Sequence, residues 1–251
     1  MTAALTIIGN HISPFVRKVL AVCEIKRLPY EIDSIVPFYG SDRFTELSPL
    51  RRIPVLIDGD TVLTDSSVIS EYLEEKWPSP SVLPGDAAAR AHARLLDEFA
   101  DTRLADVVLW KVFGRAVIGP AILGTVRDTL AIENTVRDEV PLVLNLLERW
   151  APEDGFIGGG APSLADISVA LHFANYRWAR RDIDAVRWPR TGRWIERVLT
   201  VPEVKRLNDI GAKLLRVPPD AHRPALEELG VRVTAQSLGT SSPRRGPMTV
   251  L

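Results

Sequence analysis

Ser13 lies where a serine side chain could stabilise an anion or a thiolate. It follows the β-prone run Leu5–Ile8 and directly precedes Pro14, and proline is favoured at the first position of a helix. Serine at this place is commonly a helix cap and nothing more. If the helix N-terminus faces a ligand, its free N–H groups and the serine hydroxyl also favour negative charge. A hydrogen bond from the hydroxyl to a thiolate would lower the thiol pKa by about one to two units.

A second candidate is the backbone around Pro54, which begins a β-prone run. Proline is tolerated at the start of a strand on steric grounds alone. A cis bond between Ile53 and Pro54 would instead turn the N–H and C=O of Val55 outward. An extended peptide could then pair with them as an added strand. Both interpretations fit the sequence.

Asp65 and Ser66 stand at the start of another helical pattern. Helix capping explains them as well as any binding role does. As ligand contacts, the Ser66 hydroxyl and the neighbouring N–H groups would bind a carboxylate, and Asp65 would bind an amino group. Together they would recognise the α-amino acid end of a molecule.

Other residues of chemically active types are interpreted as structural. Cys23 is the only cysteine, so the chain has neither an internal disulfide nor a cysteine cluster for zinc, and its place on an apolar helix face indicates a core residue. The four histidines show no spacing typical of a metal site, and we expect no metal. Ser163 and Asp166 have the spacing of a capping box before an apolar helix.

These residues must be positioned by two kinds of domain. Residues 1–78 alternate strand and helix signals, with a hairpin signal at Asp58–Asp60, and predict a βαβ unit followed by ββα. Prolines in residues 79–86 predict a linker. Residues 87–216 are helical in pattern throughout, so the fold class is α/β plus all-α, with a helical bundle as the C-terminal domain. The expected elements are strands 5–8, 30–35, 54–57 and 61–63, and helices starting near 14 and 66, spanning about 86–120 and 123–150, starting after 162, and spanning 189–199 and 201–215.

Residues 217–251 form an extension of different character, rich in proline and serine. A short helix is expected near residues 225–229. Because the composition beyond Ser237 is typical of disorder, we expect that part to be mobile.

The composition excludes several classes of protein. The chain has 251 residues, 46% of them hydrophobic and 25% charged, which is typical of a soluble globular protein. The net charge of −1 gives no global attraction to nucleic acid or to an anionic membrane. The most apolar long stretch, residues 104–124, contains Asp106, Lys111 and Arg115, each costly at a bilayer centre. The N-terminus lacks the charge order of a signal peptide. We expect a soluble, cytoplasmic protein with no nucleic-acid or membrane partner.

Taken in order, the motifs resemble those of the cytosolic glutathione S-transferase superfamily. The resemblance covers about residues 4–212, and the ordered set is specific for the superfamily but does not name a class. It rests on Ser13-Pro14-Phe15-Val16-Arg17-Lys18, Ser48-Pro49-Leu50-Arg51-Arg52-Ile53-Pro54-Val55-Leu56, Leu63-Thr64-Asp65-Ser66 and Ser163-Leu164-Ala165-Asp166-Ile167.

The resemblance implies a thioredoxin-like domain that binds glutathione, followed by an α-domain that helps to form the pocket of a small electrophile. Ser13 would stabilise the glutathione thiolate, and Val55 would pair with the cysteinyl backbone. Arg52 would lie near the glycyl carboxylate. The implied glutathione contacts are Phe15, Arg52, Ile53, Val55, Asp65 and Ser66, and the implied second-substrate residues are His11, Trp110, Phe113 and Arg115. The resemblance also implies a homodimer and a role in detoxification.

Two departures from the family pattern leave alternatives open. Many serine-type members place the catalytic hydroxyl two residues before the proline, where this chain has Ile12, and a glycine is common where Arg51 stands. Ser13, His11 or Asn10 could therefore activate the thiol. The rival functions are a non-catalytic glutathione-binding module and a glutathione-dependent thiol–disulfide reductase or isomerase. The lack of a cysteine at position 13 argues against the second rival.

Overall fold

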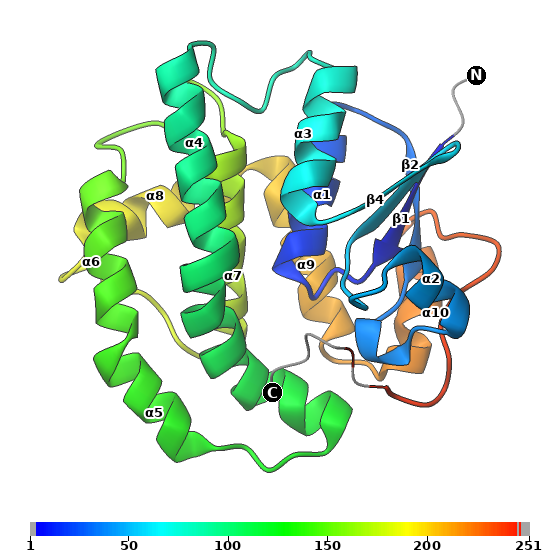
Figure 1. Cartoon of the computed structure of the whole chain (residues 1–251). Helices are drawn as coiled ribbons and strands as arrows, with labels where there is room; N and C mark the ends of the chain where they lie inside the picture. The colour runs from blue at the N-terminus through cyan, green and yellow to red at the C-terminus, as the bar shows by residue number, and fades with distance from the viewer. Residues whose placement is uncertain (1–3, 245, 247–251) are drawn as a thin grey trace. The chain divides into compact units, whose positions relative to one another are not determined.

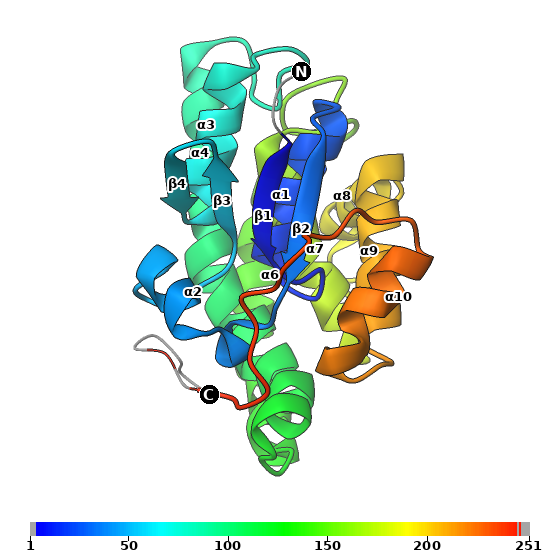
Figure 2. The ribbon, with the colours of Figure 1, turned by 90° about the vertical axis from the view of Figure 1, so that its right-hand side faces the viewer.

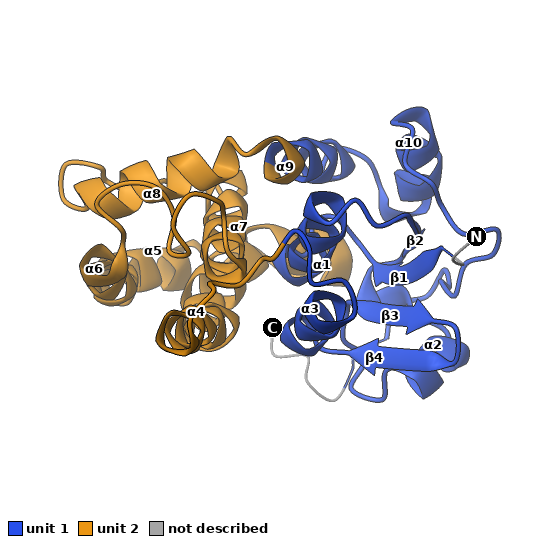
Figure 3. Ribbon diagram, turned by 90° about the horizontal axis from the view of Figure 1, so that it is seen from above, with its two compact units in different colours: residues 1–80, 205–249 blue, residues 81–204, 250–251 orange. Residues whose placement is uncertain are grey.

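The computed structural model describes residues 4–244 and 246, which form two compact units (Figures 1 and 3). The first unit consists of residues 4–80 together with 205–244 and 246. The second consists of residues 81–204. This division differs from the boundary expected at residue 216, because the last long helix and the extension cluster with the N-terminal residues.

The first unit holds, within the described residues, a mixed four-stranded sheet in the order β2-β1-β3-β4. β1 and β2 pair in parallel, whereas β3 is antiparallel to both β1 and β4. The sequence signals for these strands are confirmed to within about two residues at each end. The strands are β1 (Leu5–Gly9), β2 (Tyr30–Ser34), β3 (Val55–Asp58) and β4 (Thr61–Thr64).

α1 (Pro14–Ile25) and α3 (Ser66–Lys76) lie side by side on one face of this sheet (Figure 3). Lys18 Nζ donates to Ser67 Oγ at 3.0 Å, which ties the two helices together near their N-termini. Two short elements between β2 and β3 were not predicted, since neither is long enough to show a helical period. The further helices are η1 (Pro37–Tyr39), α2 (Asp42–Leu47), η3 (Pro219–Ala221), α10 (His222–Glu228) and α9 (Pro202–Leu214), the last belonging to this unit from residue 205.

The second unit is helical in all its described regular elements, as expected. α4 (Ala87–Phe99) continues into η2 (Ala100–Leu123), a helical segment of the wider π type. The single helix expected over 123–150 is wrong, because Pro141 lacks an N–H donor and sits at the start of a new helix. The remaining helices are α5 (Thr129–Asp138), α6 (Val140–Trp150), α7 (Leu164–Trp178) and α8 (Pro189–Leu199).

α7 is the core of the second unit, since Leu164–Tyr176 is buried on every side. Its first turn is fixed by Asp166, whose Oδ2 accepts hydrogen bonds from the backbone N and the Oγ of Ser163 at 2.8 and 2.6 Å. Oδ1 accepts from the indole N–H of Trp194 at 2.6 Å and from the N–H of Ile157 at 3.0 Å. The structural interpretation of Asp166 is confirmed.

The extension pairs with the edge of the sheet and with the residues that follow β2, and these contacts include part of the segment beyond Ser237 that was expected to be mobile. Val233 forms a parallel bridge with Ile32 of β2, and Gly239 forms an antiparallel bridge with Gly40. Figure 2 shows this segment, in orange to red, running along β2. Backbone groups of the sheet edge, rather than apolar side chains alone, bind the segment, and composition does not report such contacts. The rest of the expected mobile part, apart from Gly246, lies outside the described residues.

Candidate active site

The sheet register brings three of the candidate segments to one end of the first unit. Ile8 is the partner of Val55, and Val55 is the partner of Thr64. The end of β1, the start of β3 and the end of β4 therefore lie at the same end of the sheet. Ser13 follows the first of these ends, Ile53 precedes the second, and Asp65 follows the third.

Ser13 caps α1 and keeps its hydroxyl proton available. Its Oγ accepts a long hydrogen bond of 3.4 Å from the N–H of Val16, and the side chain is half-buried. Among the described residues no acceptor receives the Ser13 proton. A side chain at Gly9 would lie 2.5 Å from Val16, so the absence of one allows the end of β1 to approach the first turn of the helix closely. The hydroxyl and the helix N-terminus can thus face an anion together.

Asn10 is occupied by the fold itself. Its Oδ1 accepts from the N–H of Ile12 at 2.9 Å, and its Nδ2 donates to Ser34 Oγ at 3.2 Å. Nδ2 also lies 2.8 Å from Nδ1 of His222, whose Nε2 lies 3.0 Å from the carbonyl of Leu214. Since the amide donates and the carbonyl accepts, His222 is the neutral tautomer with its proton on Nε2. Asn10 therefore fastens the turn before α1 to α9 and α10, and these contacts disfavour it as a thiol activator.

His11 is fully buried beside positive charge. Burial lowers its pKa to about 3, and the positive charges of Arg17 and Arg206 add to the shift. Neither ring nitrogen has a hydrogen-bond partner within the described part of the chain. With such a pKa the imidazole stays uncharged at neutral pH and takes up a proton poorly, which disfavours His11 as a general base.

The Ile53–Pro54 bond is cis, as the ligand interpretation of this segment supposes. Val55, however, lies inside the sheet, with β1 on one side and β4 on the other. Ile53 precedes the paired stretch. The register therefore favours Ile53 over Val55 as the residue whose backbone meets an added peptide.

The segment before Ile53 is held by a buried serine that sequence analysis did not single out. Ser48 Oγ accepts from the N–H of Arg52 at 3.0 Å and donates to its carbonyl at 2.9 Å. The Arg52 side chain is exposed and free to reach an anion. Arg51, with φ of 52°, occupies the left-handed region that glycine adopts easily. A glycine is common at this position in the family, and that preference is the sequence signal that indicates the left-handed backbone here.

Asp65 has an unusual backbone of its own, with φ of 80° and ψ of 126°. One carboxylate oxygen caps α3 by accepting from the N–H groups of Ser67 and Val68 at 3.0 and 3.2 Å. The residue is exposed, and Ser66 beside it is buried. Positive φ at a residue other than glycine costs energy and is found most often at binding sites. The geometry suits an ammonium group at Asp65.

The expected second-substrate residues belong to different units. His11 is in the first, whereas Trp110, Phe113 and Arg115 lie on η2 of the second. Trp110 is 37% exposed and Arg115 is half-buried. Phe113 is fully buried, with its ring centroid 6.3 Å from that of Trp178. Phe113 therefore packs in the helical core, and Phe15 is half-buried in the first turn of α1.

Cys23 is buried in α1, as predicted. Burial raises its thiol pKa to about 12, with a smaller contribution from Glu24. Within residues 4–244 and 246 no cluster of three His, Cys, Asp or Glu side chains could hold a metal ion. In the same described part of the chain, no helix combines the length and apolar character needed to span a membrane.

Comparison with known proteins assigns the family. The profile described as "Glutathione S-transferase, N-terminal domain" matches residues 7–81. Glutathione S-transferase U2 of Arabidopsis thaliana is 28% identical over 221 residues, covering 85% of this chain and 88% of its own length. These matches support membership of the chain in the glutathione S-transferase superfamily. A glutathione S-transferase from Rhodospirillum rubrum superposes with a TM-score of 0.72 at 27% identity, covering 81% of this chain and 91% of that one.

Some relatives carry a different name. A stringent starvation protein A homologue of Haemophilus ducreyi is 44% identical, but over only 70 residues, 28% of this chain and 33% of that protein. The glutathione S-transferase relatives span most of the chain, so glutathione-dependent transfer is the function supported at family level. The thioredoxin-like fold of the first unit and the helical second unit agree with that membership.

Proposed function

We propose that this protein is a glutathione transferase in which Ser13 and the N-terminus of α1 stabilise the glutathione thiolate for attack on a small, largely apolar electrophile. The observation that carries the proposal is the meeting of Ser13, Ile53 and Asp65 at one end of the sheet. An anion-stabilising helix end, a segment suited to pair with a peptide and an acidic helix cap together match the three parts of glutathione.

Each part of the tripeptide then has a partner of suitable chemistry. The backbone of Ile53 pairs with the cysteinyl residue, and Phe15 borders it. Asp65 binds the γ-glutamyl ammonium group, and Ser66 with the neighbouring N–H groups binds its carboxylate. Arg52 reaches the glycyl carboxylate through a charge-assisted hydrogen bond.

The chain contributes orientation and electrostatics rather than a covalent step of its own. The bound thiol loses its proton to solvent, because the Ser13 hydroxyl and the helix N–H groups favour the thiolate. The sulfur lone pair then forms a bond to the electrophilic carbon, and the leaving group departs with its bonding electrons. Trp110 and Arg115 of η2 are the proposed second-substrate residues, whereas His11 is fully buried and is set aside from this role. Because Phe113 is fully buried, its role is limited to the packing of η2.

Family membership supports two further parts of the proposal. A homodimer is expected, as is common among glutathione transferases, and the exposed Leu50, Val62 and Val68 of the first unit supply apolar surface for it. A cytoplasmic role in detoxification would follow from conjugation of electrophiles, in keeping with a lone, buried cysteine.

The deciding test is a spectrophotometric titration of glutathione bound to the wild-type protein and to Ser13→Ala. The wild-type complex should show a thiol pKa at least about one unit below that of free glutathione, and the substitution should remove most of the difference. His11→Leu is the matched control and should leave the thiol pKa depressed. An unchanged Ser13→Ala complex would reject Ser13, and absence of glutathione binding would reject the transferase.

A non-catalytic glutathione-binding module is the second candidate, and a relative over 70 residues of the chain has a name that is not that of a transferase. Glutathione binding without turnover of any electrophile would select it. A thiol–disulfide reductase is disfavoured because Cys23 is buried with a thiol pKa of about 12.

A further inference from the structure

Residues 231–244 form an extended segment that we call the strap, and it runs along β2 and over the residues that follow β2 (Figure 2). The N–H of Ile32 donates to the carbonyl of Arg232 at 3.0 Å, and the N–H of Thr234 donates to the carbonyl of Ile32 at 3.1 Å. These bonds add the strap to the outer edge of the sheet, as an extra strand would be added.

Asp33 locks the strap at its middle. This aspartate of β2 is 2% exposed, and both of its carboxylate oxygens are bound by the strap. Ser237 Oγ donates to Oδ1 at 2.7 Å, and the N–H of Leu238 donates to Oδ2 at 2.7 Å. A buried carboxylate with these donors removed would be strongly disfavoured, so the contact is specific rather than incidental.

Leu238 links the strap to the apolar core that Ile53 also contacts. Its side chain packs against a buried apolar cluster formed by Ile8, Ile35, Phe44 and Val55. Ile53 also packs against this cluster. The residue proposed to pair with glutathione and the centre of the strap are therefore supported by one set of side chains.

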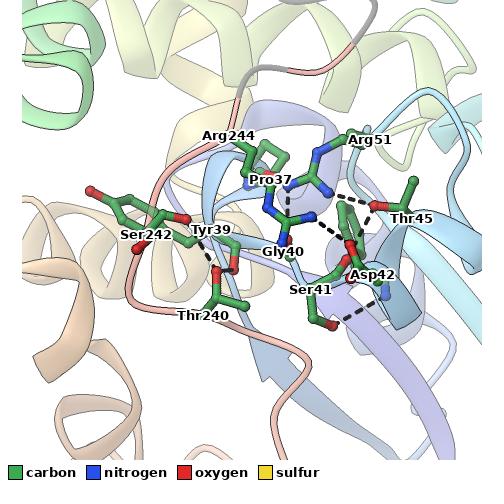
Figure 4. A network of polar contacts seen from close by, with 11 residues as sticks. Pro37, Tyr39, Gly40, Ser41, Asp42, Thr45, Arg51, Thr240, Ser242 and Arg244 are labelled. Atoms are coloured by element: carbon green, nitrogen blue, oxygen red, sulfur yellow. Dashed lines mark hydrogen bonds and ion pairs between the residues drawn. The ribbon is translucent and has the colours of Figure 1, made fainter.

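The strap next binds the segment between β2 and α2. Leu238 accepts from the N–H of Ser41 at 2.8 Å, Thr240 donates its N–H to the carbonyl of Tyr39 at 2.6 Å, and Arg244 forms an ion pair with Asp42. Figure 4 shows the contacts of Thr240 and Arg244 converging on Tyr39 and Asp42, at the end of η1 and the start of α2.

Arg51 connects these contacts to Arg52 and Ile53, the residues proposed to bind glutathione. Its guanidinium donates to Thr45 Oγ1 at 2.5 Å and to the carbonyl of Gly40 at 2.8 Å, close to the Arg244 side chain in Figure 4. At Gly246 the chain passes over the same residue, since a Cβ there would lie 2.9 Å from Arg51 Cβ. Arg51 directly precedes Arg52 and Ile53.

We infer that the strap is a positioning element of the glutathione site: it holds residues 37–51 where Arg52 and Ile53 can reach the tripeptide. The inference rests on the proposed function. Loosening the strap should weaken glutathione binding while leaving the thiolate stabilised, because the strap bonds described above go to β2 and to residues 37–51 rather than to Ser13.

The test compares two double variants of equal composition in the full chain. Ser237→Ala with Arg244→Ala removes one bond to Asp33 and the ion pair to Asp42. Ser241→Ala with Arg232→Ala removes the same side-chain types from exposed positions of the strap. Glutathione affinity is measured by calorimetry, and amide hydrogen exchange is followed in residues 37–51, with residues 55–76 reporting that the rest of the unit stays folded.

The strap variant should bind glutathione at least about threefold more weakly than the control variant, with exchange in residues 37–51 about tenfold faster. With a chromogenic aryl halide as electrophile, KM for glutathione should rise while kcat and the bound-thiol pKa stay unchanged. Equal affinities of wild type, strap variant and control would overturn this inference alone. Failure of the wild type to bind glutathione would overturn the proposed function, and the inference with it.

Discussion

At the scale of single residues, burial separates the roles of His11 and Ser13, which lie in the same turn between β1 and α1. Ser13 is half-buried and can offer its proton to a ligand, whereas His11 is enclosed beside Arg17, Arg206 and His222. Sequence spacing placed both residues in the turn before the first helix. It could not tell them apart, because Arg206 and His222, which help to enclose His11, belong to helices about 200 positions later in the chain.

The enclosed histidine predicts how stability responds to acid. The folded-state pKa of His11 is lowered to about 3 from 6.5, so between these values the unfolded chain binds the extra proton. The stability that His11 contributes is therefore complete above pH 6.5 and is lost as pH falls toward 3. The unfolding free energy of wild type should fall by about 1.4 kcal/mol per pH unit from this residue, and His11→Leu should remove that slope.

Urea unfolding between pH 5 and 7.5, in steps of about half a pH unit, measures this slope. The exposed His92→Leu variant serves as the control that also loses one imidazole. Parallel slopes for wild type and His11→Leu would show that His11 is accessible to protons in the folded state.

At the scale of elements, caps and prolines were the sequence signals that predicted structure best. Ser13 and Asp65 each cap the helix that the sequence assigned to them, and Asp86 caps the helix expected from about residue 86. Such signals are local, since a cap and the N–H groups it accepts from lie within three residues of each other. The break between α5 and α6 was available from the same logic at Pro141, but the apolar period runs across it. The short α2 shows no period at all.

Asp166 allows the value of a buried cap to be measured. Asp166→Ala should lower the unfolding free energy by about 3 kcal/mol, because the N–H groups of Ile157 and Ser163 and the indole of Trp194 would remain buried without their acceptor. Asp128→Ala, which removes a single exposed cap of α5, should cost only about 1 kcal/mol. Denaturant unfolding followed by circular dichroism compares the two, and equal losses would contradict the cooperative role given to Asp166.

At the scale of the whole molecule, the C-terminal part of the chain packs in the same unit as its N-terminal part. Helices α9 and α10 and the strap belong to the same unit as the N-terminal sheet. Asn10 and His222, in contact at 2.8 Å, are 212 positions apart. No pattern within a short window of sequence reports such a pairing. Composition therefore suggested a mobile tail, whereas the unpaired edge of β2 and the carboxylate of Asp33 specify where the strap lies.

Removing the strap tests what it does for the whole molecule. A chain ending at Gly230 leaves the outer edge of β2 without the bonds to Arg232 and Thr234 and leaves Asp33 without its donors. An exposed strand edge is a template for pairing with another chain, so this variant should form species larger than the full-length protein. A chain ending at Arg244 keeps these contacts and is the control. Light scattering coupled to size-exclusion chromatography measures both, over about a tenfold range of concentration. If both chains match the full-length protein in mass, the edge of β2 is protected by its own twist and charges, and the strap serves only the segment from residue 37 to 51.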